Sequence, residues 1–239
     1  MLANLLSLNI SSAYLHEPDS ELMKYRYGND QLFTQQAFWN FVNSESQKAF
    51  KIHMLVCIIL LAIYKANAST RMICIKPITL LDVMPEVSDA LKIAKVIYIC
   101  RHPAGRSESI LRQLKHDQNI EVISNNELET LGRDWGMTNR KVKDWFQHHP
   151  AWHWVFFENL ANDPTVEFGK LYEQFGLTWN EWVVAKIQQR TTIEGSGFYE
   201  AQRDSRKQPD KWRKSLTEEQ VEAIRRGCLP FETNLYDSF

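Results

Sequence analysis

The segment Lys95–Gln113, KVIYICRHPAGRSESILRQ, decides the fold class of this chain of 239 residues. It predicts a buried apolar strand that stops at Arg101, then a Pro/Gly turn, then a helix that starts near Ser109. Ligands of α/β proteins bind at the carboxyl ends of parallel strands, and helix N-termini attract anions. Arg101 and Ser109 therefore suggest a phosphate-binding site, although the same spacing also fits an arginine at a sheet edge and a serine that caps a helix.

Two more apolar runs predict short buried strands, RMICIK at Arg71–Lys76 and WVFF at Trp154–Phe157. Each ends beside a charged side chain, Lys76 or Glu158. Segments with a helical pattern lie between the runs, and alternating strands and helices favour parallel sheets. We therefore expect residues 1–239 to form a single domain with three α/β/α layers around a central parallel sheet.

Helices are expected in the polar and mixed segments between the strands. The last one begins at Thr217, because TEEQ is a capping box, and it ends at Arg226 with Gly227 behind it. Gly176 is expected to end an earlier helix. The other expected helices are Phe50–Asn67, Asn126–Phe146, Val166–Phe175 and Asn180–Gln189.

Composition limits the function classes that remain open. Lys and Arg total 28 against 29 Asp and Glu, and this balance argues against a general binder of nucleic acid or anionic membranes. The cysteines, Cys57, Cys74, Cys100 and Cys228, form no CxxC pair. They suggest buried free thiols in a reducing, cytoplasmic setting and no metal site. The apolar run Met54–Tyr64 is shorter than the roughly 20 residues of a membrane span.

A second basic cluster, RDSRKQPDKWR, occupies Arg203–Arg213. Five of its eleven residues are basic, and Trp212 stands among them. It could form a loop that closes over an anion with Trp212 as its anchor, or it could be a solvated charged loop.

Groups for acid–base or charge-stabilising chemistry stand at two other places. Lys76 ends a predicted strand and could neutralise charge in a transition state, or it could extend along the surface into solvent. His16 or Glu17 could act as a general base if held in a cleft, although a His-Glu pair is commonly structural.

Taken together, these segments resemble the sulfotransferases that use 3′-phosphoadenosine 5′-phosphosulfate (PAPS). YICRHPAGRSESILR is similar to the family's 3′-phosphate-binding segment, with Arg101 and Ser109 at its arginine and serine. VFFENLANDP is similar to the Tyr-Glu-Asp-Leu segment, with Phe157 in place of the tyrosine. SRKQPDKWRKSLT resembles the late basic loop, in which Gln208 replaces a glycine, and ICIKP resembles a strand-end Lys-Pro of carbohydrate-type members.

The resemblance implies a P-loop NTPase-like fold and transfer of a sulfuryl group from PAPS. The acceptor would be a hydroxyl or amine of a small molecule or carbohydrate, and no metal would be needed. Glu17 would be the base, with His16 as the alternative, and Lys76 would stabilise charge on the bridging oxygen or help to orient the acceptor. The residues implied to hold the nucleotide are Arg101, Ser109, Phe157, Arg203, Arg206, Lys207 and Trp212.

The chain departs from the family pattern at its start. Family members open with a strand and a Pro-Arg-Ser-Gly-Thr-Thr-like loop that cradles the 5′-phosphosulfate. Here Met1–Asn9 resembles the helix that follows that loop, so we expect the first strand and the loop to be missing from this chain.

Besides an active enzyme, two alternatives stay open. One is a non-catalytic remnant that binds a nucleotide or a partner without turnover. The other is a P-loop enzyme similar to nucleotide or nucleoside kinases.

Overall fold

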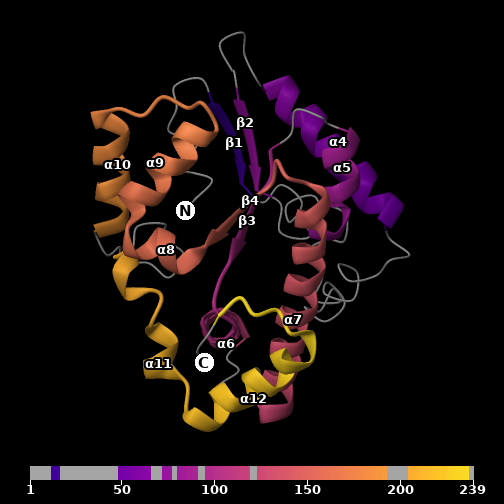
Figure 1. The fold of residues 1–239 in the computed structure, drawn as a ribbon, viewed down its shortest axis with the longest axis vertical. Coiled ribbons are helices and arrows are strands. Elements are labelled where there is room, and N and C mark those ends of the chain that lie inside the picture. Colours follow the sequence, from indigo (N-terminus) through magenta and orange to yellow (C-terminus); the bar gives the residue numbers. More distant parts are fainter. Residues whose placement is uncertain are drawn as a thin grey trace. The chain divides into compact units, whose positions relative to one another are not determined.

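The computed structural model describes residues 12–16, 48–65, 72–76, 80–90, 95–118, 123–192 and 204–236 (Figure 1). Contacts between residues divide the chain into two compact units. Unit 1 comprises Met1–Ala94 and Tyr172–Val183, and unit 2 comprises Lys95–Leu171 and Val184–Phe239. The expectation of a single domain over residues 1–239 stays a prediction.

Unit 1 contains a pair of parallel strands. Strand β1 (Ser12–His16) pairs with β2 (Met72–Lys76), and His16 lies opposite Lys76 at the last position of the register. The strand expected at Arg71–Lys76 is therefore confirmed with a shift of one residue at its start.

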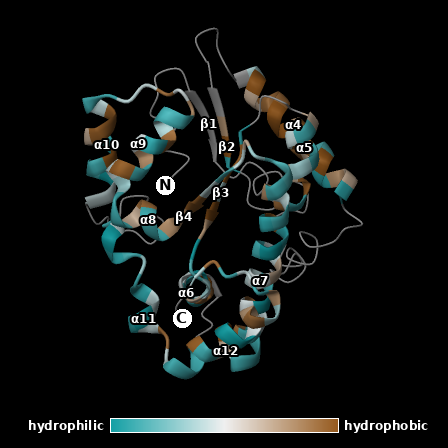
Figure 2. Ribbon diagram, in the orientation of Figure 1, coloured by the Kyte–Doolittle hydropathy of each residue, from teal (hydrophilic) through white to brown (hydrophobic). Residues whose placement is uncertain are grey.

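Helix α4 (Lys48–Lys65) supplies much of the core of unit 1 and is mostly hydrophobic (Figure 2). Its residues Met54, Leu55 and Ile58 pack with apolar side chains at and around η2 (Leu81–Val83) and α5 (Met84–Ala90). Among the described residues, no helix is both long enough and apolar enough to cross a membrane.

Unit 2 contains the other parallel pair, formed by β3 (Ile97–Cys100) and β4 (His153–Phe156). Cys100 lies opposite Phe156 in the register, so both strands end at the same edge. Helices α6 (Pro103–Gln118) and α7 (Asn125–His148) connect the two strands along the chain. Parallel strands with helices between them confirm the α/β class.

The helix after β3 begins at Pro103, so the expected start near Ser109 is wrong. His102 takes the capping place, because its carbonyl accepts from the Arg106 N–H at 2.8 Å and its ring Nδ1 accepts from the Ala104 N–H at 3.2 Å. Proline is favoured at the first helical position, where its missing N–H costs nothing. The Pro/Gly pair therefore begins the helix and does not form a separate turn.

The remaining elements follow the expected pattern closely. The Thr217 capping box is confirmed, and Gly176 adopts a φ of 64° behind α9, as expected for a helix end. Gly227 does not end the last helix, which runs on to Cys228. These elements are α8 (Phe157–Asn162), α9 (Pro164–Gln174), α10 (Glu181–Thr192), η3 (Ser205–Lys207), α11 (Lys211–Ser215), α12 (Glu218–Cys228) and η4 (Leu229–Phe231).

Helices α7 and α12 pack closely along each other, and two glycines allow the approach. A Cβ on Gly132 would lie 2.1 Å from the Ile224 carbonyl oxygen, and one on Gly227 would lie 2.0 Å from that of Glu129. This contact explains why Gly227 stands inside a helix.

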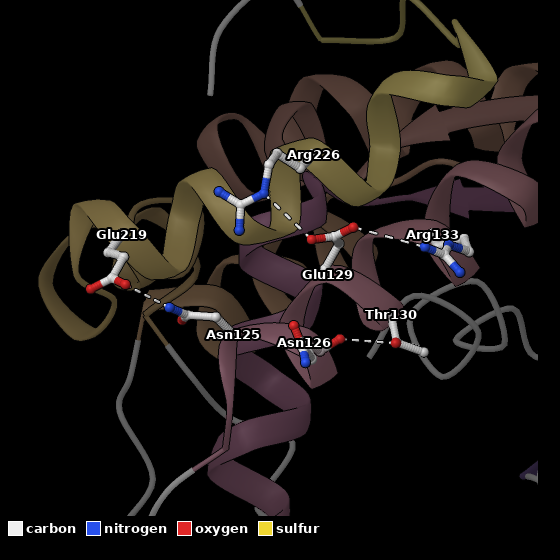
Figure 3. Close-up of polar contacts among 7 residues, drawn as sticks. All are labelled: Asn125, Asn126, Glu129, Thr130, Arg133, Glu219 and Arg226. Carbon is white, nitrogen blue, oxygen red and sulfur yellow. Dashed lines mark hydrogen bonds and ion pairs between the residues drawn. The ribbon is translucent and has the colours of Figure 1, made fainter.

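Polar contacts line the edge of the α7–α12 interface (Figure 3). Asn125 Nδ2 donates to Glu219 Oε1 at 2.7 Å, and Glu129 pairs with Arg226 at 3.4 Å and with Arg133 at 3.8 Å. These side chains are exposed or half-buried, so the apolar contacts and the two glycines make the larger contribution to the interface.

Candidate functional site

Arg101 lies just past the carboxyl end of β3, and both its side chain and its backbone carbonyl make contacts that hold it in place. Its Nη2 donates to the Gln208 carbonyl at 3.3 Å, and its Cζ lies 4.6 Å from the centre of the Phe157 ring. Trp135 Nε1 donates to the Arg101 carbonyl at 2.9 Å. A Cβ on Gly105 would lie 3.1 Å from Arg101 Nε, so the glycine leaves room for the guanidinium.

The Nε of Arg101 is buried and has no hydrogen-bond partner among the described residues. Burial lowers the pKa of Arg101, while the nearby carboxylates of Glu108 and Glu158 act to raise it. Arginine does not lose its proton under ordinary conditions, so the cation persists. A cation with an unused, buried donor is well suited to bind an anion such as a phosphate.

The loop around η3 is tied to α8 and to Arg101. The Ser205 hydroxyl donates to a backbone carbonyl of α8 at 2.7 Å, and the Gln208 carbonyl receives the Arg101 side chain. The structure therefore brings the loop that carries Arg206 and Lys207 to Arg101, while the nucleotide-binding role that the resemblance implies for these residues stays a prediction. The contact uses a backbone carbonyl, so it does not require the glycine that Gln208 replaces.

The two basic residues of this loop differ in their surroundings. Arg206 is exposed to solvent, and Lys207 Nζ lies 3.1 Å from Asp204 Oδ2 in an exposed ion pair. An exposed pair of this kind contributes little to stability and can exchange for another anion at small cost. Both cations could turn toward a phosphate.

Trp212 is an anchor of the loop in this structure. Its side chain is only 4% exposed and stacks on the His102 ring, with centroids 4.7 Å apart and planes 3° apart. Arg213 Cζ lies 4.2 Å from the centre of the same indole. This placement fits the sequence-based prediction that Trp212 anchors the basic loop. Direct contact between Trp212 and a nucleotide stays a prediction.

Glu158 accepts hydrogen bonds from two residues that are distant in the sequence, an arrangement that the sequence did not reveal. Its Oε1 accepts from the His102 N–H at 2.9 Å, and its Oε2 accepts from the Tyr236 hydroxyl at 2.7 Å. The rings of His102 and Tyr236 meet edge to face at 4.9 Å. Only the charge of Glu158 was apparent in the sequence, because the residues of this arrangement lie far apart along the chain.

Ser109 lies half-buried inside α6, away from the helix start. The residues just before it carry buried polar atoms without partners among the described residues: Arg106 Nη1, Ser107 Oγ and Glu108 Oε2. Burial also lowers the pKa of Arg106. Unpaired buried polar atoms are rare in folded proteins, so their concentration on α6 and Arg101 marks this part of unit 2 as unusual.

The residues expected to act on an acceptor belong to unit 1. His16 and Lys76 are direct partners at the ends of β1 and β2, so the structure brings these two positions together. Lys76 is half-buried. Glu17, in unit 1, and Arg203, in unit 2, lie outside the described residues.

A cleft of about 780 Å³ opens beside Trp212 in unit 2. Its lining mixes aromatic, acidic and basic side chains, and the basic ones already have carboxylate neighbours. Arg213 lies 3.1 Å from Asp210, and Arg225 lies 3.4 Å from Glu222. The surroundings of Arg101 are therefore the better candidate for a phosphate site. In the part of the chain that the structure describes, no three His, Cys, Asp or Glu side chains gather in a way that could hold a metal ion.

The sequence model of the sulfotransferase family matches residues 9–181. Arg101, Ser109 and Phe157 lie inside the matched range, and the loop with Arg206 and Lys207 lies beyond it. No curated protein matches the chain.

Two solved structures are similar to this chain. One is the sulfotransferase domain from the Synechococcus PCC 7002 olefin synthase, at 16% identity over 93% of this chain and 82% of that one, with a TM-score of 0.46. The other is the sulfotransferase domain from the curacin biosynthetic pathway, at 13% identity over 95% of this chain and 86% of that one, with a TM-score of 0.45.

Proposed function

Because the chain belongs to the sulfotransferase family, we propose that it transfers a sulfuryl group from PAPS to an acceptor. The acceptor is a hydroxyl or amine of a small molecule or carbohydrate. The observation that carries the proposal is Arg101, whose buried Nε has no partner among the described residues and whose Nη2 holds the late basic loop. The donor set fits a phosphate, because a guanidinium can donate two parallel hydrogen bonds to its oxygens.

In this proposal unit 2 binds the 3′-phosphate of the donor. Arg101 donates from its guanidinium, and Arg206 and Lys207 add positive charge from the loop. Ser109 adds a hydroxyl donor from α6. Phe157, whose ring lies against the Arg101 guanidinium, presents an apolar surface beside the phosphate. Trp212 holds the loop in place through its stack on the neighbouring His102.

The chemical step is a direct displacement at sulfur. PAPS supplies an activated sulfuryl group on a good leaving group, the 5′-phosphate. The acceptor oxygen or nitrogen forms a bond to sulfur, the bond from sulfur to the 5′-phosphate oxygen breaks, and the acceptor proton passes to Glu17 or His16. Lys76 stabilises the negative charge that develops on the bridging oxygen. The products are the sulfated acceptor and 3′,5′-adenosine bisphosphate.

Calorimetry on the whole chain tests the nucleotide site. We expect 3′,5′-adenosine bisphosphate to bind at least about tenfold more tightly than adenosine 5′-monophosphate, because only the bisphosphate offers charge-assisted bonds to Arg101. Equal affinities for the two nucleotides would overturn the proposal.

Turnover is measured separately, with radiolabelled PAPS and a panel of phenols, sugars and amines. Transfer of label to one acceptor class supports the enzyme and identifies the class. Tight bisphosphate binding with no transfer to any member of the panel favours the non-catalytic alternative.

A further inference from the structure

We propose that Tyr236 is a positioning residue for Arg101. Its hydroxyl holds the Glu158 carboxylate in an orientation that leaves the Arg101 guanidinium available to the 3′-phosphate. This inference rests on the proposed role of Arg101 in binding that phosphate.

Both oxygens of Glu158 are occupied by donors other than Arg101. Oε1 accepts from the His102 N–H at 2.9 Å, and Oε2 accepts from the Tyr236 hydroxyl at 2.7 Å. Within the described residues no ion pair joins Glu158 to Arg101. The two donors lie on separate oxygens, so together they fix the orientation of the carboxylate, although each oxygen keeps a lone pair that could accept another bond.

Glu158 lies in the neighbourhood of Arg101, because it accepts from the N–H of His102, the next residue along the chain. The Glu158 charge acts on Arg101 and opposes the fall in the Arg101 pKa that burial causes. The ring of the preceding residue, Phe157, lies 4.6 Å from the Arg101 guanidinium. Arginine and a carboxylate form strong paired hydrogen bonds when they can meet. A Glu158 side chain released from Tyr236 would therefore occupy the donors that the phosphate needs.

The Tyr236 side chain is held firmly enough to direct its hydroxyl. Its ring packs edge to face on His102 at 4.9 Å and on Phe156 at 5.6 Å, and it lies 6.1 Å from the Trp135 ring. The segment before it is also tied down, because Lys143 Nζ donates to the Thr233 carbonyl at 3.1 Å. Burial raises the pKa of Tyr236 far above its ordinary value, so the hydroxyl remains a donor at every pH of interest.

Three variants of the whole chain test this inference: Tyr236→Phe, Glu158→Gln and the double variant. We expect Tyr236→Phe to weaken binding of 3′,5′-adenosine bisphosphate about tenfold, because the released Glu158 carboxylate competes with the 3′-phosphate for Arg101. The size of the effect corresponds to the one hydrogen bond to a charged group that held Glu158. Affinity for adenosine 5′-monophosphate should not change. Adding Glu158→Gln should restore bisphosphate affinity, because an uncharged amide cannot form an ion pair with Arg101.

Tyr98→Phe is the matched control. Tyr98 also packs against the core of unit 2, and its hydroxyl donates to Asn139 Oδ1 at 3.0 Å, so its loss removes one buried hydrogen bond without touching Glu158. We expect Tyr98→Phe to lower the melting temperature and to leave the preference for bisphosphate as in the unmodified chain.

Several results would overturn the inference. Tyr236→Phe could lower the affinity for both nucleotides by the same factor, or the double variant could fail to recover the bisphosphate affinity. Either result would reduce Tyr236 to a packing residue. If Tyr236→Phe does not fold, Glu158→Gln alone decides, because a fall in its bisphosphate affinity contradicts a competing carboxylate. Failure of the proposed function is distinguishable, since it appears in the unmodified chain as equal affinity for the two nucleotides.

Discussion

Replacing Arg101 with alanine is expected to weaken binding of 3′,5′-adenosine bisphosphate about a hundredfold, because the proposed site would lose two charge-assisted hydrogen bonds to the 3′-phosphate. Binding of adenosine 5′-monophosphate should change little, since that nucleotide has no 3′-phosphate. The bisphosphate affinity of Arg101→Lys should lie between those of the unmodified chain and Arg101→Ala, because lysine keeps the charge but loses the planar fork of donors. Calorimetry with both nucleotides measures the three affinities.

Arg101 also holds the loop at Gln208, so the alanine variant needs a control for structure. Arg133→Ala removes an arginine from the exposed face of α7, where it pairs with Glu129 at 3.8 Å (Figure 3). We expect Arg133→Ala to bind the bisphosphate as the unmodified chain does. A folded Arg101→Ala protein with undiminished bisphosphate affinity would exclude Arg101 from the phosphate site.

Gly227→Ala should have the largest effect on stability. A Cβ at this position would lie 2.0 Å from the Glu129 carbonyl oxygen and 2.7 Å from the Arg133 nitrogen, and neither backbone atom can move without shifting α7. We expect a loss of about 3 kcal/mol in the free energy of unfolding, at the upper end of overpacking costs. This corresponds to a fall of roughly 6–12 °C in melting temperature for a chain of this size.

Gly136→Ala is a graded comparison on the same helix. A Cβ there would meet the ring of Phe231 at 2.4 Å, and a side chain can rotate where a backbone cannot, so the loss should be smaller. Helix propensity alone would favour alanine over glycine by about 1 kcal/mol. A Gly227→Ala protein as stable as the unmodified chain, in calorimetric melting, would contradict the close α7–α12 contact.

Local rules were sufficient for most of the elements. The apolar runs before Lys76 and Arg101 predicted β2 and β3, and the Thr217 capping box predicted the start of α12, because each signal lies within a few residues of its effect. The signals failed where a distant residue changed the meaning of a local one. Gly227 was expected to end a helix, but a backbone carbonyl of α7 occupies the space that its Cβ would need.

The candidate site was predicted in the same uneven way. The spacing from Arg101 to Ser109 and the basic cluster at Arg206 and Lys207 indicated an anion site. The structure brings Arg101 and the basic cluster together through Gln208. The sequence did not indicate a role for Tyr236, because that role depends on the contact of its hydroxyl with Glu158, which only the structure shows. Nor could helix periodicity show that Ser109 lies inside α6, since the helix already begins at Pro103, after the capping residue His102.

The sequence separation of the contacts around Arg101 determines when, during folding, these contacts can form. Arg101 and Gln208 are 107 positions apart, and Glu158 and Tyr236 are 78 apart. Contacts between distant positions must overcome the entropy of closing a long loop, so they tend to form late in folding. Helices α6 and α7 can form from neighbouring residues, whereas the Arg101 surroundings are complete only after the segment with Tyr236 has been synthesised and has joined them. Nucleotide binding would therefore report that unit 2 has finished folding.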